Sequence, residues 1–505
     1  MDSIDVFDTA IFRDVYQPTD IFTLIEQEVG KDFKRLRIEA ENKASASNRF
    51  YTIQDIYKHL YGFNLEKEIE MEMKHVYANP KILSMYMNNP NNYVFISDMY
   101  LSSETIKKLL EICGYKNPRV FVSCEAKCNK GSGILFNKIQ KFLGKIDYHY
   151  GDNYKSDIQG AVKQGINPIF HPALHKQELN LPAVKNPILK KYAAELEANE
   201  TDPLVILAKY YAPLIYDFTK WVLQRQEGQS VYFLSRDMFM PYFIAKNFMH
   251  EKNVYYIYCS RKSLCPLIMN GKDKILIKKM TNIFGNEAKM KKFEGTESAT
   301  NYLKSTGIKN NDIIADIGYA ATSQRVIEQA LKIKLCGKYI QLGDVPKEFS
   351  EMNTNQYLNR MVLTYRFLAE FVFTSPEDNM NGYINGKPSF TPDYEERKEY
   401  AKKIAKIVLD KSLFEKMNKM NLSLFDIEQM LIHIQTYPSY EIMELFNKPI
   451  LTNRKDAERG INFDREKILK GGLMDCYRYS YAKPLFKKML EHDKELNSLV
   501  KLLPQ

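Results

Sequence analysis

The stretch IDVFDTA, residues 4–10, combines the apolar residues Ile4, Val6 and Phe7 with two aspartates and a threonine. A short apolar run that ends in an acidic residue is typical of a buried strand whose last residues reach the edge of a parallel sheet. Four similar runs follow it: YVFISD (93–98), RVFVS (119–123), YHYGD (148–152) and NPIFHP (167–172). Helical patterns separate these runs, and the alternation predicts a doubly wound, Rossmann-like α/β domain.

The length of 505 residues allows two or three domains. We expect the first α/β domain over residues 1–176, with a helical insertion, or cap, at about 14–90. Residues 177–200 are polar and helix-prone, and are expected to form a linker. A second Rossmann-like α/β domain is expected over 201–394, and a Lys-rich helical pattern predicts a C-terminal helical region over 395–505. The predicted strands of the second domain are 230–235, 254–260, 312–318 and 338–343.

The composition is that of an ordinary globular protein, with 45% hydrophobic and 27% charged residues. The net charge of +10 comes from dispersed lysines, so we do not expect the chain to bind nucleic acid. The seven cysteines form no CxxC pair, which argues against a zinc site and favours a reducing compartment. The sequence has no leader-like N-terminus and no long apolar run, which predicts a cytoplasmic protein without a transmembrane segment.

Chemically active side chains recur where the strands of the first domain end. They are Asp5, Thr9, Ser97, Lys130, Asp152 and Asp157. The carboxyl ends of parallel strands meet at one edge of the sheet, so we expect these side chains to converge there. A carboxylate nucleophile can form an acyl phosphate, a hard cation held by carboxylates offsets the repulsion between anions, and a hydroxyl and an ammonium can bind phosphoryl oxygens. The pattern therefore predicts a Mg²⁺-dependent site for phosphoryl transfer.

The order and spacing of these residues resemble the four motifs of the haloacid dehalogenase (HAD) superfamily. The segments that carry the resemblance are IDVFDT (4–9), FISDMYLSSE (95–104), KGSGILF (130–136) and GDNYKSD (151–157). They are similar to a branch of large predicted hydrolases associated with bacterial surface-polysaccharide synthesis. The resemblance implies a phosphorylated sugar or nucleotide sugar as substrate, with glycan-assembly enzymes as possible partners.

The resemblance also implies a role for each residue. Asp5 would be the nucleophile, Thr9 would support its loop, and Ser97 and Lys130 would bind phosphate. The expected ligands of Mg²⁺ are Asp5, the carbonyl oxygen of Phe7, Asp152 and Asp157.

One position departs from the motif. HAD phosphatases carry a second aspartate two residues after the nucleophile as general acid, and here that residue is Phe7. Four interpretations stay open: a leaving group that needs no acid, a donor from the cap, transfer to an acceptor, or a non-catalytic domain that serves as a scaffold for glycan-assembly enzymes. Dehalogenases also have an aromatic residue there, but the paired acids Asp152 and Asp157 favour a metal and phosphate.

Polar residues also follow the predicted strands of the second domain. They are Ser235, Arg236, Asp237, Arg261, Asp316, Thr322, Ser323 and Gln324. Hydroxyl groups at a helix start and nearby arginines suit a phosphate, and the pattern loosely resembles that of phosphoribosyltransferases. We expect a phosphate- or sugar-binding site here, lined further by Glu370 and the loop 375–388; a transferase active site in 201–394 and purely structural ion pairs are the alternatives.

Several other polar residues are expected to be structural. Asp98 and Ser103 are candidate helix caps. His149 is expected in the core, and His171 and His175 in a structural loop.

Overall fold

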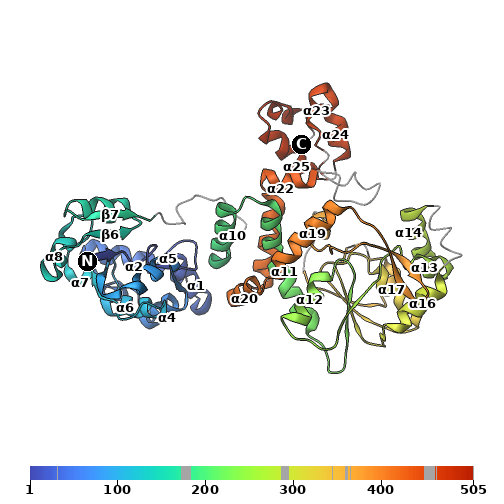
Figure 1. Ribbon diagram of the computed structural model, residues 1–505, viewed down its shortest axis with the longest axis horizontal. Helices are drawn as coiled ribbons and strands as arrows, with labels where there is room; N and C mark the ends of the chain where they lie inside the picture. Colours follow the sequence, from blue (N-terminus) through green and yellow to red (C-terminus); the bar gives the residue numbers. More distant parts are fainter. Residues whose placement is uncertain are drawn as a thin grey trace. The chain divides into compact units, whose positions relative to one another are not determined.

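The computed structural model describes residues 1–30, 32–171, 184–285, 295–343, 345–358, 362–363, 366–447, 461, 463–480 and 482–503. The chain divides into two compact units, Met1–Asn199 and Glu200–Gln505, each with a five-stranded parallel sheet (Figure 1). The helical region after residue 395 belongs to the second unit. His175 and residues 177–183 of the expected linker lie outside the described residues, and most of the remaining linker is helix α10 (Pro187–Asn199).

The sheet of the first unit has the strand order β5-β4-β1-β6-β7, and all of its pairs are parallel. Its strands are β1 (Asp2–Ile4), β4 (Tyr93–Ser97), β5 (Val120–Val122), β6 (Tyr148–Gly151) and β7 (Asn167–Phe170). The expected α/β class is thus confirmed. Strands β4 and β5 lie on one side of β1, and β6 and β7 lie on the other side. The strand order therefore reverses between β1 and β6. At such a switch point the carboxyl ends of the strands open a crevice for ligands.

Helices cover both faces of this sheet because successive side chains of a strand point to opposite faces. Val94 and Ile96 pack with α8 on one face, while Ile4 and Phe95 pack with α5 and α6 on the other. The helices that follow the strands are α6 (Ser103–Ile112), α7 (Ser123–Ala126), α8 (Ile134–Leu143), the π-helix η2 (Tyr154–Gln159) and α9 (Gly160–Val162).

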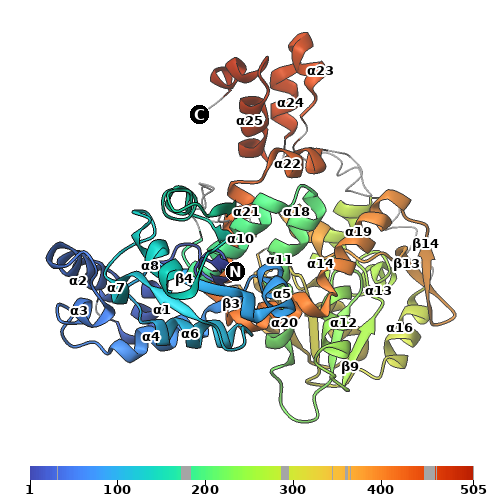
Figure 2. The same ribbon diagram turned by 60° about the vertical axis from the view of Figure 1, so that its left-hand side comes forward.

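The helical insertion between β1 and β4 has two parts. A short antiparallel pair, β2 (Ile11–Arg13) with β3 (Val76–Ala78), brackets helices that have a hydrophobic core of their own (Figure 2). Those helices are α1 (Asp20–Val29), α2 (Phe33–Ser47), α3 (Ile53–Tyr57) and α4 (Leu65–Lys74). Helix α5 (Pro80–Asn88) packs instead on the core of the sheet, through Tyr86. The insertion's separate core therefore ends before the expected limit at residue 90.

The sheet of the second unit has the order β12-β11-β10-β8-β9 and is also parallel. Its strands are β8 (Val231–Leu234), β9 (Val254–Ile257), β10 (Ile313–Asp316), β11 (Cys336–Tyr339) and β12 (Asn353–Gln356). Here the order reverses between β8 and β10. Strand β11 begins and ends earlier than the expected 338–343, and β12 was not expected.

Helices again flank this sheet (Figure 1). They are α11 (Pro203–Leu223), α12 (Phe239–Asn247), α13 (Cys265–Asn270), α14 (Lys274–Phe284), α16 (Thr296–Ser305), α17 (Thr322–Leu331), η5 (Lys347–Phe349) and α18 (Arg366–Val372). The segment 375–388, expected to be a loop, contributes to a β-hairpin of β13 (Asn379–Ile384) and β14 (Lys387–Thr391) beside α16 (Figure 2). The two residues at its tip, Asn385 and Gly386, both have positive φ, the geometry that a tight hairpin turn requires.

The elements described after residue 394 are helical, in agreement with the sequence. They are α19 (Glu395–Val408), α20 (Lys411–Met420), α21 (Leu424–Thr436), α22 (Tyr440–Asn447), α23 (Arg465–Lys467), η8 (Ile468–Gly472), α24 (Leu473–Tyr479), α25 (Lys483–His492) and η9 (Asn497–Leu502). Helices α19 and α21 pack on α11 of the same unit. Among the described helices, none combines the length and apolar character needed to cross a membrane.

Candidate functional site

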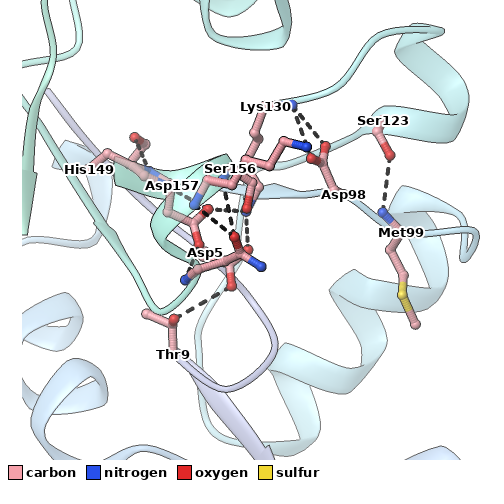
Figure 3. Close-up of polar contacts among 12 residues, drawn as sticks. Asp5, Thr9, Asp98, Met99, Ser123, Lys130, His149, Ser156 and Asp157 are labelled. Carbon is pink, nitrogen blue, oxygen red and sulfur yellow. Dashed lines mark hydrogen bonds and ion pairs between the residues drawn. The ribbon is translucent and has the colours of Figure 1, made fainter. Parts of the chain in front are cut away.

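The nucleophile candidate Asp5 lies at the switch point of the first sheet, directly after β1. Its backbone N–H donates a hydrogen bond of 2.8 Å to the carbonyl of Tyr150 in β6, which fixes the backbone at this edge. A tight turn follows, in which the N–H groups of Ala10 and Ile11 both donate to the Val6 carbonyl at 2.9 Å. The turn returns Thr9 to Asp5, and the Thr9 hydroxyl donates to Asp5 Oδ2 at 3.5 Å (Figure 3).

Lys130 reaches the same point from the loop before α8. Its ammonium contacts Asp5 Oδ1 and lies 2.5 Å from Asp157 Oδ1 (Figure 3). The backbone N–H of Lys130 donates to both carboxylate oxygens of Asp98, at 3.0 and 3.1 Å. Asp98 therefore anchors the lysine loop, and the cap of α6 is Ser102, which accepts from the Thr105 N–H at 3.2 Å.

Asp157 is held rigidly on the π-helix η2, a helix type that is frequent at functional sites. Its Oδ2 accepts the Asn153 N–H at 2.8 Å, and its Oδ1 lies 3.2 Å from His149 Nε2. The other ring nitrogen of His149 pairs with the Ser3 hydroxyl at 2.8 Å. A Cβ added to Gly151 would come within 2.4 Å of Asp157, so only glycine leaves room for this carboxylate beside β6.

Three carboxylates form a group that could hold a metal ion. Asp5, Asp152 and Asp157 are all buried, and each offers an oxygen within 4.8 Å of the other two. Carboxylate oxygens are the ligands that Mg²⁺ prefers, and such a site usually keeps several waters. The side chain of Phe7, in the turn after Asp5, packs under the guanidinium of Arg13 at 4.1 Å.

Burial and the neighbouring charges shift the pKa values of this cluster in opposite directions. Burial raises the pKa of Asp5 well above its usual value, although Lys130 counteracts it. Burial lowers the pKa of Lys130, but Asp157 and Asp5 outweigh it and raise the pKa overall. Burial raises the pKa of Asp157, but Lys130 and His149 outweigh it and hold the pKa below its usual range. Lys130 is therefore a cation at neutral pH, and a metal ion beside Asp5 would favour its carboxylate form.

Ser97 is the last residue of β4 and is 3% exposed. In the part of the chain that the structure describes, its hydroxyl has no hydrogen-bond partner. This hydroxyl is thus available to a ligand at the same edge as Asp5. Ser97 ends β4, and the other five residues expected in the first site follow β1, β5 or β6, all at the carboxyl edge of one sheet.

The residues expected in the second unit are only partly brought together. Burial raises the pKa of Asp316 well above its usual value, and the negative charges of Asp237 and Glu370 raise it further, so these acids lie near one another. Burial raises the pKa of both Asp237 and Asp316, and the positive charge of Arg261 counteracts part of this rise in each. Ser235 accepts the Cys259 N–H at 3.1 Å, which joins the ends of two strands. The fully buried Gln324 is held by Glu328 and Tyr339 at 3.0 and 2.8 Å and does not face a ligand site.

Three residues that contact the first site were not expected there from the sequence: Asp98, His149 and Asn153. Asp98 is adjacent to Ser97, and Asn153 is adjacent to Asp152, which were the available signals. His149 lies in the expected core strand, but its bond to Asp157 could be found only from the structure.

Comparison of the chain with models of protein families and with curated proteins gave no match.

Proposed function

We propose that the unit Met1–Asn199 catalyses Mg²⁺-dependent phosphoryl transfer, with Asp5 as the nucleophile. The observation that carries the proposal is the convergence of Asp5, Asp152 and Asp157 within 4.8 Å, with the Lys130 ammonium in contact with two of them. Carboxylates that are buried together are costly unless a cation compensates them. A site of this kind suits a reaction in which an anionic nucleophile attacks an anionic phosphate.

The proposed reaction has two steps. An Asp5 carboxylate oxygen attacks phosphorus, the bond from phosphorus to the leaving oxygen breaks, and an aspartyl phosphate forms. Water or another acceptor then attacks the phosphorus and releases Asp5. Lys130 and Ser97 bind phosphoryl oxygens, and Thr9 orients Asp5. Mg²⁺, held by Asp5, Asp152, Asp157 and, by motif resemblance, the Phe7 carbonyl, would neutralise charge on the transferring group.

Phe7 limits the substrates that this site can use. A phenyl ring cannot protonate a leaving group, and a missing general acid costs about 10²–10⁴-fold in rate. The proposal therefore favours substrates with good leaving groups, such as nucleotide sugars, which release a nucleotide, acyl phosphates, which release a carboxylate, and anomeric sugar phosphates. The sugar component rests on the motif resemblance to hydrolases of surface-polysaccharide synthesis. A non-catalytic scaffold that binds the same ligands is the second candidate, and Phe7 is the residue that favours it.

The test measures release of inorganic phosphate from sugar phosphates and acyl phosphates, and release of nucleoside monophosphate and sugar phosphate from nucleotide sugars. Activity is expected with Mg²⁺ and not with EDTA. Asp5→Asn should abolish it, while the matched variant Asp8→Asn, three residues further along the same turn, should retain it. Mg²⁺ binding without turnover would support the scaffold. Turnover that survives Asp5→Asn would remove the chemistry from this site.

A further inference from the structure

The sheet of the second unit has a switch point of its own, where the strand order reverses between β8 and β10. Ser235–Asp237 follow β8, and Asp316 is the last residue of β10. A turn then leads into α17, which begins at Thr322. The turn packs tightly on the end of β11, because a Cβ added to Gly318 would lie 2.0 Å from the Gln341 carbonyl oxygen. The start of α17 is thereby held at the same sheet edge as Asp237 and Asp316.

One carboxylate oxygen at this edge, Asp237 Oδ1, lacks a hydrogen-bond donor among the described residues, and a second carboxylate, Asp316, has a single backbone donor. Asp237 Oδ1 is shielded from solvent and accepts no hydrogen bond from the described residues. Its ion-pair partner, Arg236 Nε, lies 3.6 Å away, which is too long for a hydrogen bond. Asp316 accepts a hydrogen bond of 2.8 Å from the N–H of the adjacent Ile317. A shielded carboxylate oxygen without a donor is costly, and a hydroxyl group of a ligand would satisfy Asp237 Oδ1.

Donors for an anion lie beside these acids. Thr322 is 7% exposed, and neither its hydroxyl nor that of Ser323 has a partner in the described part of the chain. The first N–H groups of α17, those of residues 322–324, likewise have no acceptor among the described residues. Arg261 is exposed and forms no ion pair or hydrogen bond with the described residues, although its charge acts on Asp237 and Asp316. A helix start with free N–H groups and a guanidinium without a bound partner near the same acids together suit a phosphate.

We propose that this edge is a second ligand site, which binds a phosphorylated ligand with free hydroxyl groups, such as a sugar phosphate. The phosphate contacts the start of α17 and Arg261. The ligand's hydroxyl groups donate to Asp237 and Asp316. The site is separate from Asp5, which lies on the other sheet, and it does not depend on the reaction proposed there.

The test is hydrogen exchange of the full chain, read peptide by peptide by mass spectrometry, with ribose 5-phosphate, inorganic phosphate or ribose as probe. The free N–H groups at the start of α17 should exchange rapidly without a probe. Ribose 5-phosphate should slow exchange in peptides that cover residues 316–326, and ribose alone should not. The peptide-level measurement distinguishes this site from the one at Asp5, because phosphate bound beside Asp5 should instead protect peptides around residues 130 and 152.

Two variants and one matched control sharpen the test. Arg261→Gln should weaken the protecting effect of ribose 5-phosphate about tenfold or more, as expected for loss of a charge-assisted hydrogen bond. Arg225→Gln is the matched control, because Arg225 pairs with Glu251 before β8 and β9, at the opposite edge of the sheet. Asp316→Ala should remove the preference for ribose 5-phosphate over inorganic phosphate. Unchanged exchange at residues 316–326, or protection that Arg261→Gln leaves intact, would overturn the proposal.

Discussion

Replacing Lys130 by methionine removes a positive charge that contacts two buried carboxylates, those of Asp5 and Asp157. The Lys130 side chain is 3% exposed, and those of Asp5 and Asp157 are 9% and 1% exposed. Breaking a buried ion pair by removing one partner costs about 3–5 kcal/mol, because the remaining charge is uncompensated. In a domain of this size each kcal/mol lowers Tm by about 2–4 °C. Lys130→Met should therefore lower the Tm of the first unit by about 6–20 °C in EDTA.

The chain offers internal controls for this measurement. Its single tryptophan, Trp221, lies in α11 of the second unit, so calorimetry should show the shift while tryptophan fluorescence reports an unchanged second unit. Lys163→Met removes an exposed lysine that donates to the Gly131 carbonyl at 2.8 Å, and a surface change of about 0.5 kcal/mol should move Tm by no more than about 2 °C. Mg²⁺ at about 100 times its Kd should raise the free energy of unfolding of the Lys130→Met variant by about 2.7 kcal/mol. If Lys130→Met and Lys163→Met have the same Tm in EDTA, the buried cluster does not exist as described.

Three further outcomes are expected. Gly151→Ala should weaken Mg²⁺ binding at least tenfold in calorimetric titration, because the new Cβ would lie 2.4 Å from Asp157; an unchanged affinity would contradict the geometry. Burial raises the folded-state pKa of Asp316 above its usual value of 3.8. The free energy of unfolding therefore falls as pH rises above 3.8, because the unfolded chain releases this proton first. Asp316→Asn should accordingly raise the Tm read from Trp221 fluorescence at pH 7 but not at pH 3, and an equal shift at both pH values would exclude this cause. Because of Phe7, aryl or acyl phosphates should be hydrolysed about 10²–10⁴-fold faster than alkyl phosphates, and similar rates would indicate another general acid.

Much of the fold could be predicted because most strands are short apolar runs. The run at 93–97 coincides with β4, and the expected strand 148–152 extends one residue beyond β6. Strand β12 could not be found in this way, because its sequence, NTNQ, has no apolar residue and it forms an edge of the sheet beside β11. The hairpin of β13 and β14 did carry a signal, the Asn385–Gly386 pair, which favours a tight hairpin turn.

The candidate site was predictable for a different reason. The carboxyl ends of parallel strands share one edge, so residues that follow the strands converge whatever the intervening sequence. Asp5 and Asp152 are far apart in the chain but lie in the same buried group. The supporting contacts depend on packing instead. His149 reaches Asp157 only because β6 and η2 are adjacent, and Asp98 meets the Lys130 backbone across a loop that has no local pattern.

A crystal structure with Mg²⁺ and beryllofluoride, which mimics an aspartyl phosphate, would decide whether one cation and one phosphoryl group share this edge. We expect beryllium bonded to a carboxylate oxygen of Asp5, with Lys130 and Ser97 on its fluorines. We also expect Mg²⁺ at about 2.0–2.1 Å from oxygens of Asp5, Asp152 and Asp157. An Asp5 carboxylate free of beryllium, or a magnesium ion bound away from these three residues, would contradict the proposed chemistry.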